Sequence, residues 1–127
     1  MNRITALHAN LLFTILLVFG ALTIWGLVEA ARSRPPGALY LSALRIGELL
    51  LIAQALLGVA LLAGGLRPAR PELHVVYAVV AVVTLPAAQR YVRDRTPRQQ
   101  MLTYALACLF LCAIVLRGVE TGRAAPL

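Results

Sequence analysis

Four long apolar stretches separated by short polar segments dominate the sequence. Residues 4–28, 49–66, 73–89 and 99–116 contain no charged side chain. Each stretch is about 16 to 25 residues long, close to the ~20 residues with which an α-helix crosses a bilayer. The pattern predicts an all-α, integral membrane protein with four spanning helices.

Proline and glycine mark the ends of the predicted helices. Pro35, Pro36 and Gly37 lie in the first loop, and Gly64 and Gly65 begin the second. Proline lacks a backbone donor, and glycine is common where helices end. Because short loops make consecutive helices antiparallel neighbours, we expect an up-down-up-down bundle in which the first and third helices are diagonal. The whole chain, 1–127, is predicted to be one transmembrane domain with helices at about residues 5–29, 39–64, 72–90 and 99–117.

Composition agrees with a membrane location. Of the 127 residues, 61% are hydrophobic and 13% charged, and a chain of this size has no interior that could hide so much apolar surface. All twelve basic residues are arginines, and all but Arg45 lie in the loops, the tails or at the ends of the spans, beside the expected headgroups. The predicted surroundings are therefore the lipid bilayer and other membrane proteins or further copies of the chain. A nucleic-acid partner is not expected.

The arginines also bear on orientation. The loop between the third and fourth spans carries Arg90, Arg93, Arg95 and Arg98. By the positive-inside rule this loop is cytoplasmic, so both termini are expected together on the non-cytoplasmic side. The alternative that the first stretch is a cleaved signal peptide stays open, although its length favours a retained helix.

The two histidines are the sharpest chemical signal. His8 begins the first predicted helix and His74 begins the third, so both are expected on one membrane side at similar depth. Diagonal helices of a bundle lie roughly 14 Å apart, from a neighbour spacing of 8 to 10 Å. Helices at that distance leave room for a planar macrocycle between two axial imidazoles, so a bis-histidine haem b site is geometrically possible. The alternative is that both histidines simply lie among the lipid headgroups.

Haem carries two propionate groups, which favour nearby cations. Arg67 and Arg70 lie in the predicted loop just before His74, and Arg3 and Arg117 approach the same membrane side. In the haem hypothesis these arginines bind the propionates. The small residues Ala78 and Ala81, which follow His74 on one helix face, leave room for a ring.

Three polar residues lie inside the second predicted span. Arg45 and Glu48 are three residues apart, a spacing that allows an ion pair. Gln54 shares a face with Gly47, Gly58 and Gly65, which predicts a close interhelical contact with the amide as a hydrogen-bonding group. Charge inside a membrane is a functional hypothesis by default. The alternatives are polar packing, a quinone or proton site at Glu48 and Gln54, and a small transporter that uses Glu48.

Other chemistries receive little support from the sequence. Cys108 and Cys112 lie four residues apart in one span, with side chains pointing the same way, so they are expected to be packing residues rather than a disulfide. No nucleophilic triad or glycine-rich phosphate loop is present, so no independent catalytic activity is expected. Our leading hypothesis is a small accessory or cofactor-carrying subunit of a membrane, bioenergetic assembly. The alternative is an electron-transfer haem b protein.

Overall fold

The computed structural model describes residues 2–65, 68 and 70–122, and these residues form four α-helices. In chain order the helices are α1 (Asn2–Ala31), α2 (Ala38–Ala63), α3 (Pro71–Tyr91) and α4 (Pro97–Gly122). Each is long and apolar enough to cross a membrane. The prediction of four helices of this kind is confirmed.

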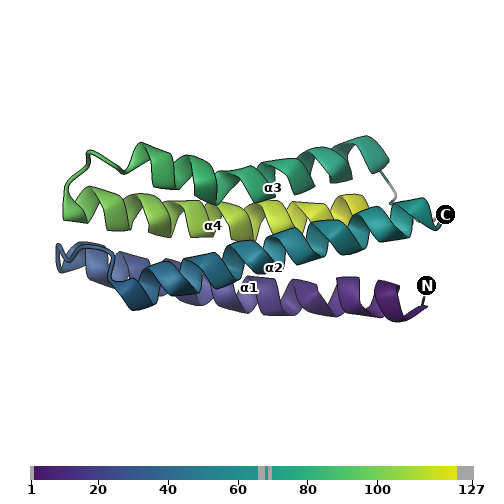
Figure 1. Cartoon of the computed structure of the whole chain (residues 1–127), viewed down its shortest axis with the longest axis horizontal. Helices are drawn as coiled ribbons and strands as arrows, with labels where there is room; N and C mark the ends of the chain where they lie inside the picture. Colours follow the sequence, from purple (N-terminus) through teal and green to yellow (C-terminus); the bar gives the residue numbers. More distant parts are fainter. Residues whose placement is uncertain (1, 66–67, 69, 123–127) are drawn as a thin grey trace.

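The helices lie alongside one another, and each reverses the direction of the one before it (Figure 1). The start of α1, the end of α2, the start of α3 and the end of α4 therefore share one end of the molecule. The neighbouring pairs are α1–α4, α3–α4, α1–α2 and, with the smallest contact, α2–α3. As a result, α1 and α3 occupy diagonal corners.

Local sequence explains where the helices begin and end. α2 follows Gly37, whose carbonyl accepts a hydrogen bond from Leu41 N at 3.0 Å. It ends at a turn in which Gly65 has a φ of 91°, a conformation that glycine adopts without strain. α4 begins at Pro97, two residues before the predicted start. Thr96 Oγ1 accepts from Gln99 N at 3.2 Å and Gln99 Oε1 accepts from Thr96 N at 3.1 Å, which together form a capping box.

The core is packed most closely around α1 and α4. Phe19 is fully buried against Gly47, where a Cβ atom would lie 2.8 Å from its ring. At Gly26 a Cβ atom would lie 2.7 Å from Tyr40 Oη and 2.9 Å from Ala105 Cβ. Tyr40 is buried and donates a hydrogen bond to Leu22 O at 3.0 Å. Small residues thus let three of the four helices approach one another closely.

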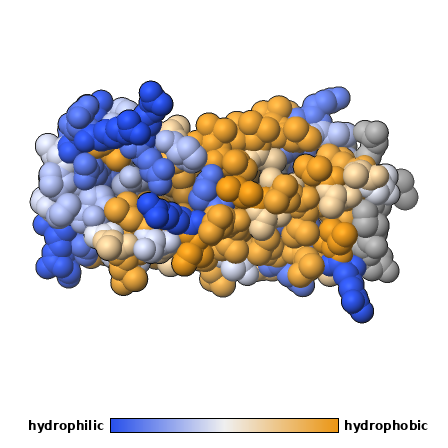
Figure 2. Space-filling model, in the orientation of Figure 1, coloured by the Kyte–Doolittle hydropathy of each residue, from blue (hydrophilic) through white to orange (hydrophobic). Residues whose placement is uncertain are grey.

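The outer surface is apolar over much of its length. Leu17 is 75% exposed and Phe13 is 66% exposed, although both lie well inside α1. Figure 2 shows this hydrophobic surface over the middle of the molecule and the end that carries the termini, with hydrophilic residues gathered at the opposite end. Soluble proteins rarely expose so large an apolar surface, and lipid would cover it.

Candidate functional site

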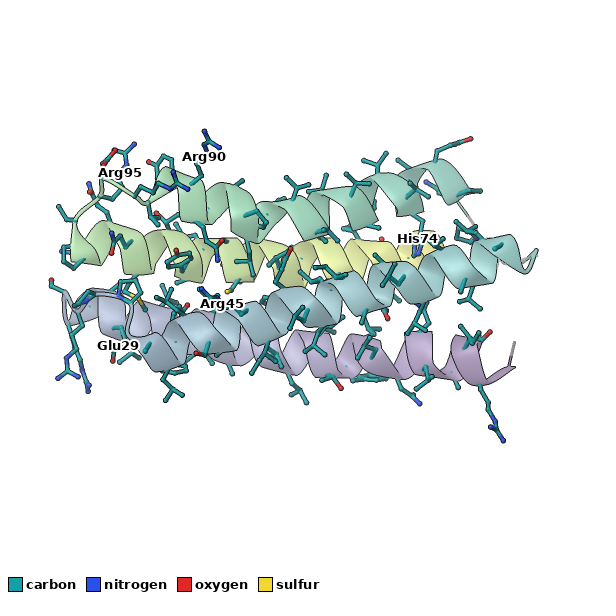
Figure 3. The ribbon with its side chains drawn as sticks, in the orientation of Figure 1. Glu29, Arg45, His74, Arg90 and Arg95 are labelled. Carbon is teal, nitrogen blue, oxygen red and sulfur yellow. The ribbon has the colours of Figure 1, made fainter. Side chains whose placement is uncertain are left out.

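The two histidines meet inside one end of the bundle. His8 comes from α1 and His74 from α3, the two diagonal helices, and their ring centroids are 6.3 Å apart with an angle of 63° between the ring planes. Figure 3 shows His74 on the inner side of α3, in the half of the molecule that holds the termini. Both residues are partly buried. The two rings therefore lie close together in the interior of the bundle, in a T-shaped arrangement.

A cavity of about 870 Å³ surrounds the two rings and is lined by all four helices. Ligand pockets typically have about 300 to 1,000 Å³, so this one accommodates a large cofactor. Its walls are mostly apolar. Several of the lining side chains are small and leave the space between the helices unfilled: Ala9, Ala55, Gly58, Ala78, Ala81 and Gly118. At Gly58 a Cβ atom would lie 3.4 Å from Cε1 of His8, so the glycine gives this imidazole its room.

Hydrogen bonds hold the two histidines differently. His74 Nδ1 lies 3.0 Å from the carbonyl oxygen of Gly118 and donates to it, because a carbonyl oxygen can only accept. His8 is held through its backbone, whose carbonyl accepts a hydrogen bond from Gln54 Nε2 at 2.8 Å. Within the described residues, His8 Nδ1 and Gln54 Oε1 are buried and have no hydrogen-bond partner. Such atoms are rare in folded proteins, so both call for an explanation.

Of the arginines predicted to bind propionates, those that the structure describes (Arg3, Arg70 and Arg117) do not line this cavity. Arg70 is exposed at the start of α3, and its carbonyl accepts a hydrogen bond from His74 N at 2.9 Å. Arg117 is exposed and forms an ion pair with Glu120 at 2.8 Å. Arg3 is also exposed, and Arg67 lies outside the described residues. Two of these arginines are nevertheless close to His74 along the chain. Arg70 bonds to His74 N through its own carbonyl, and Arg117 directly precedes Gly118, whose carbonyl contacts His74 Nδ1.

In α2, the expected interhelical partner of the Gln54 amide is present, as His8 O on α1, whereas two other expectations differ from the structure. Arg45 and Glu48 form no ion pair in the part of the chain that the structure describes, and Glu48 Oε1 is buried without a hydrogen-bond partner. The spacing puts both residues on one surface, but Arg45 extends to the exposed side. Gly65 belongs to the turn after α2, and a Cβ atom added there would have no neighbour within 4 Å, so the close-packed glycines end at Gly58.

The two cysteines lie in the packed interior and do not form a disulfide. Cys108 is buried, Cys112 is half-buried, and both are free thiols. In residues 2–65, 68 and 70–122, no three histidine, cysteine, aspartate or glutamate side chains gather to hold a metal ion.

Gly118 could not be found from the sequence because its contribution is a backbone carbonyl, which residue type does not reveal. Gln89, near the end of the third apolar stretch, was a visible polar signal that no prediction used.

No protein-family model, curated protein or solved structure matches this chain. The interpretation of the site therefore rests on its own geometry.

Proposed function

We propose that this protein is a small integral membrane protein that holds one haem b between His8 and His74 and carries electrons for a larger membrane assembly. The observation that carries the proposal is the 6.3 Å separation of the two ring centroids across a large cavity. An imidazole nitrogen lies roughly 1.2 Å from its ring centroid and a metal–nitrogen bond is about 2.0–2.1 Å long, so two imidazoles on one ion have centroids roughly 6 to 6.5 Å apart. The pair has the spacing of two axial ligands.

The number of ligands favours haem over a bare metal ion. Two imidazoles leave most of the coordination sphere of a zinc or iron ion to be filled by other groups. No third histidine, cysteine or carboxylate joins them within the described residues. A porphyrin brings four nitrogens of its own, so His8 and His74 would suffice as the protein ligands of its iron. The apolar cavity suits the faces and edges of such a ring.

The surrounding groups would then have defined tasks. The Gly118 carbonyl, by holding the proton on His74 Nδ1, would orient the imidazole for haem binding through Nε2, as outer hydrogen bonds do for most ligating histidines. Gln54 fixes the backbone of α1 at His8. Arg70 lies four residues before His74, and Arg117 directly precedes Gly118, which lines the cavity. In this proposal both arginines would bind the propionates. Bound haem would supply one-electron transfer, and the chain supplies binding, orientation and exclusion of water.

The test of this proposal is the visible spectrum of the purified protein, expressed with adequate haem. Two axial imidazoles give a low-spin, six-coordinate haem, so the protein should be red. His8→Ala and His74→Ala should each leave a five-coordinate iron or lose the haem, with matching effects. Added imidazole should restore the low-spin spectrum in variants that still bind haem, because it replaces the missing ligand and not a packing contact.

A colourless protein would contradict the proposal, and so would a red protein whose spectrum both substitutions leave unchanged. Gel filtration of each variant provides the control for folding.

The membrane arrangement is part of the same proposal. We propose that the four helices cross the bilayer up-down-up-down, with both termini on the non-cytoplasmic side. The four arginines of residues 90–98 support this orientation. Reporters fused before Met1 and after Leu127 should report one and the same compartment, outside the cytoplasm. Opposite compartments for the two reporters would contradict the bundle, and a shared cytoplasmic location would reverse its orientation.

A further inference from the structure

A second, smaller cavity lies on the seam between α2 and α3. It has a volume of about 280 Å³ and is lined by three residues of each helix: Arg45, Glu48, Leu49, Leu85, Pro86 and Gln89. Four of them are exposed, so the cavity opens on the outside of the bundle. Figure 2 shows hydrophilic side chains interrupting the apolar surface between these helices. In a membrane, this opening would face the lipid.

The polar groups of the cavity are not paired with one another. Glu48 Oε1 is buried without a hydrogen-bond partner in the described chain. Arg45, three residues earlier, lines the same space and forms no ion pair with Glu48 among these residues. A buried carboxyl oxygen without a partner costs about 1 to 3 kcal/mol or more, so its retention calls for a ligand or a bound proton.

The chemistry of the wall restricts the class of ligand. A carboxyl group accepts hydrogen bonds, whereas the Arg45 guanidinium donates them and the Gln89 amide does both. Leu49, Leu85 and Pro86 make the rest of the wall apolar. A phosphate would be repelled by Glu48 and an ammonium group by Arg45. An apolar ring with hydroxyl groups meets all these conditions, because its O–H donates to the carboxylate and its oxygens accept from the guanidinium and the amide.

We propose that this cavity binds the head ring of a quinol dissolved in the bilayer, with Glu48 accepting a hydrogen bond from one ring hydroxyl. The opening toward lipid gives such a ligand its entry, and its apolar tail remains in the membrane. The site is a binding site for a neutral amphipathic ring and is separate from the histidine cavity.

The two cavities are consecutive along the same seam. Leu51 and Ala81 line the histidine cavity, whereas Glu48 and Leu85, each one helical turn away, line the smaller one. With a rise of 1.5 Å per residue, Glu48 is about 9 Å along the helix from Gln54, beside His8. Figure 3 shows Arg45 and His74 in opposite halves of the molecule.

The distance of about 9 Å along α2 between Glu48 and Gln54 is short enough for electron transfer from the quinol to haem. This step rests on the proposed function. One ring O–H bond breaks and its proton passes to the Glu48 carboxylate, which becomes a carboxylic acid. Haem bound by His8 and His74 would take up one electron from the ring. The ring is left as the neutral radical that has lost one hydrogen atom overall.

The test combines two measurements on the full-length protein in detergent. The first is calorimetric titration with a short-chain benzoquinol kept reduced, and this reading does not depend on haem. The second is the rate at which the same quinol reduces the haem, followed by visible absorption. Glu48→Gln keeps the shape of the side chain and removes the charged acceptor, so binding and rate should both fall about tenfold or more, since hydrogen bonds to charged groups are the stronger ones.

Glu29→Gln is the matched control, because Glu29 lies on α1 and lines neither cavity. It should bind and react like the unaltered protein. Undetectable quinol binding, or equal binding by Glu48→Gln and the unaltered protein, would overturn the quinol site whatever the haem content. Binding that depends on Glu48 in a protein without haem would support the quinol site and contradict the haem proposal.

Discussion

The α1–α4 side and the α2–α3 seam of this bundle are built on opposite principles. On the first side, Gly26 is in such close contact with Tyr40 and Ala105 that an added Cβ would overlap both. Along the second lie a cavity of about 280 Å³ between α2 and α3 and, next to it, one of about 870 Å³ that extends inward and is lined by all four helices. One side is filled with protein atoms, and the other keeps space that side chains of ordinary size would fill.

Polar groups follow the same division. The buried hydroxyls of Thr23 and Tyr40 have partners in backbone carbonyls at 2.7 and 3.0 Å. The buried atoms without partners in the described chain belong instead to His8, Gln54 and Glu48, all of which line the cavities. Because unpaired polar atoms and empty space both cost stability, their coincidence at the two cavities supports the proposal that these cavities bind ligands.

The largest effect is expected where the packing is closest. Gly26→Ala would place a Cβ 2.9 Å from Ala105 Cβ and 3.2 Å from the Ala105 Cα, so two backbones must separate. We expect a loss of about 1 to 3 kcal/mol in the free energy of unfolding, measured by titration with a denaturing detergent. Gly20→Ala is the control on the same helix, because no atom lies within 4 Å of its added Cβ. Equal stability of the two variants would mean that α1 and α4 are not in close contact.

The division between the two sides was only partly visible in the sequence. Uncharged stretches bounded by proline and glycine predict four helices because a backbone in lipid must satisfy its own hydrogen bonds. The start of α4 at Pro97 was also readable, since Thr96 and Gln99 have the capping-box spacing. Helix ends depend on neighbouring residues and can be found from local pattern.

Contacts between helices could not be predicted in the same way. Tyr40 and Tyr104 lie near span ends, where aromatic residues usually mark the membrane surface, yet both are buried in the bundle. The spacing of Arg45 and Glu48 allows an ion pair that the structure does not form, because the direction of a long flexible side chain depends on its surroundings and not on spacing alone. The similar depth of His8 and His74 was visible, but their 6.3 Å separation depends on the packing of all four helices.

A smaller effect, and one of a different kind, is expected when the histidine cavity is filled. Ala78 lines this cavity one turn after His74. Ala78→Phe should lower the haem content at least about tenfold and change the free energy of unfolding by less than about 1 kcal/mol, because the ring enters existing space. Haem per protein and detergent unfolding measure the two quantities. Ala87→Phe, at an exposed position of α3 outside both cavities, should alter neither. A destabilisation as large as that of Gly26→Ala would show that the cavity wall is closely packed.

The smallest effect is expected at Gln54, which lines the histidine cavity and also bonds α2 to α1. Gln54→Leu removes the 2.8 Å hydrogen bond to His8 O but also removes Oε1, a buried atom without a partner in the described residues. The two changes act in opposite directions, so the unfolding free energy should fall by only about 0.6 kcal/mol, the average for such bonds within membranes, and by less than about 2 kcal/mol. Thr84→Val is the control, because the Thr84 hydroxyl bonds within its own helix, to Val80 O at 2.7 Å. A gain in stability in Gln54→Leu would mean that the unpaired oxygen outweighs the bond to α1, and that Gln54 is present for a ligand in the cavity rather than for the fold.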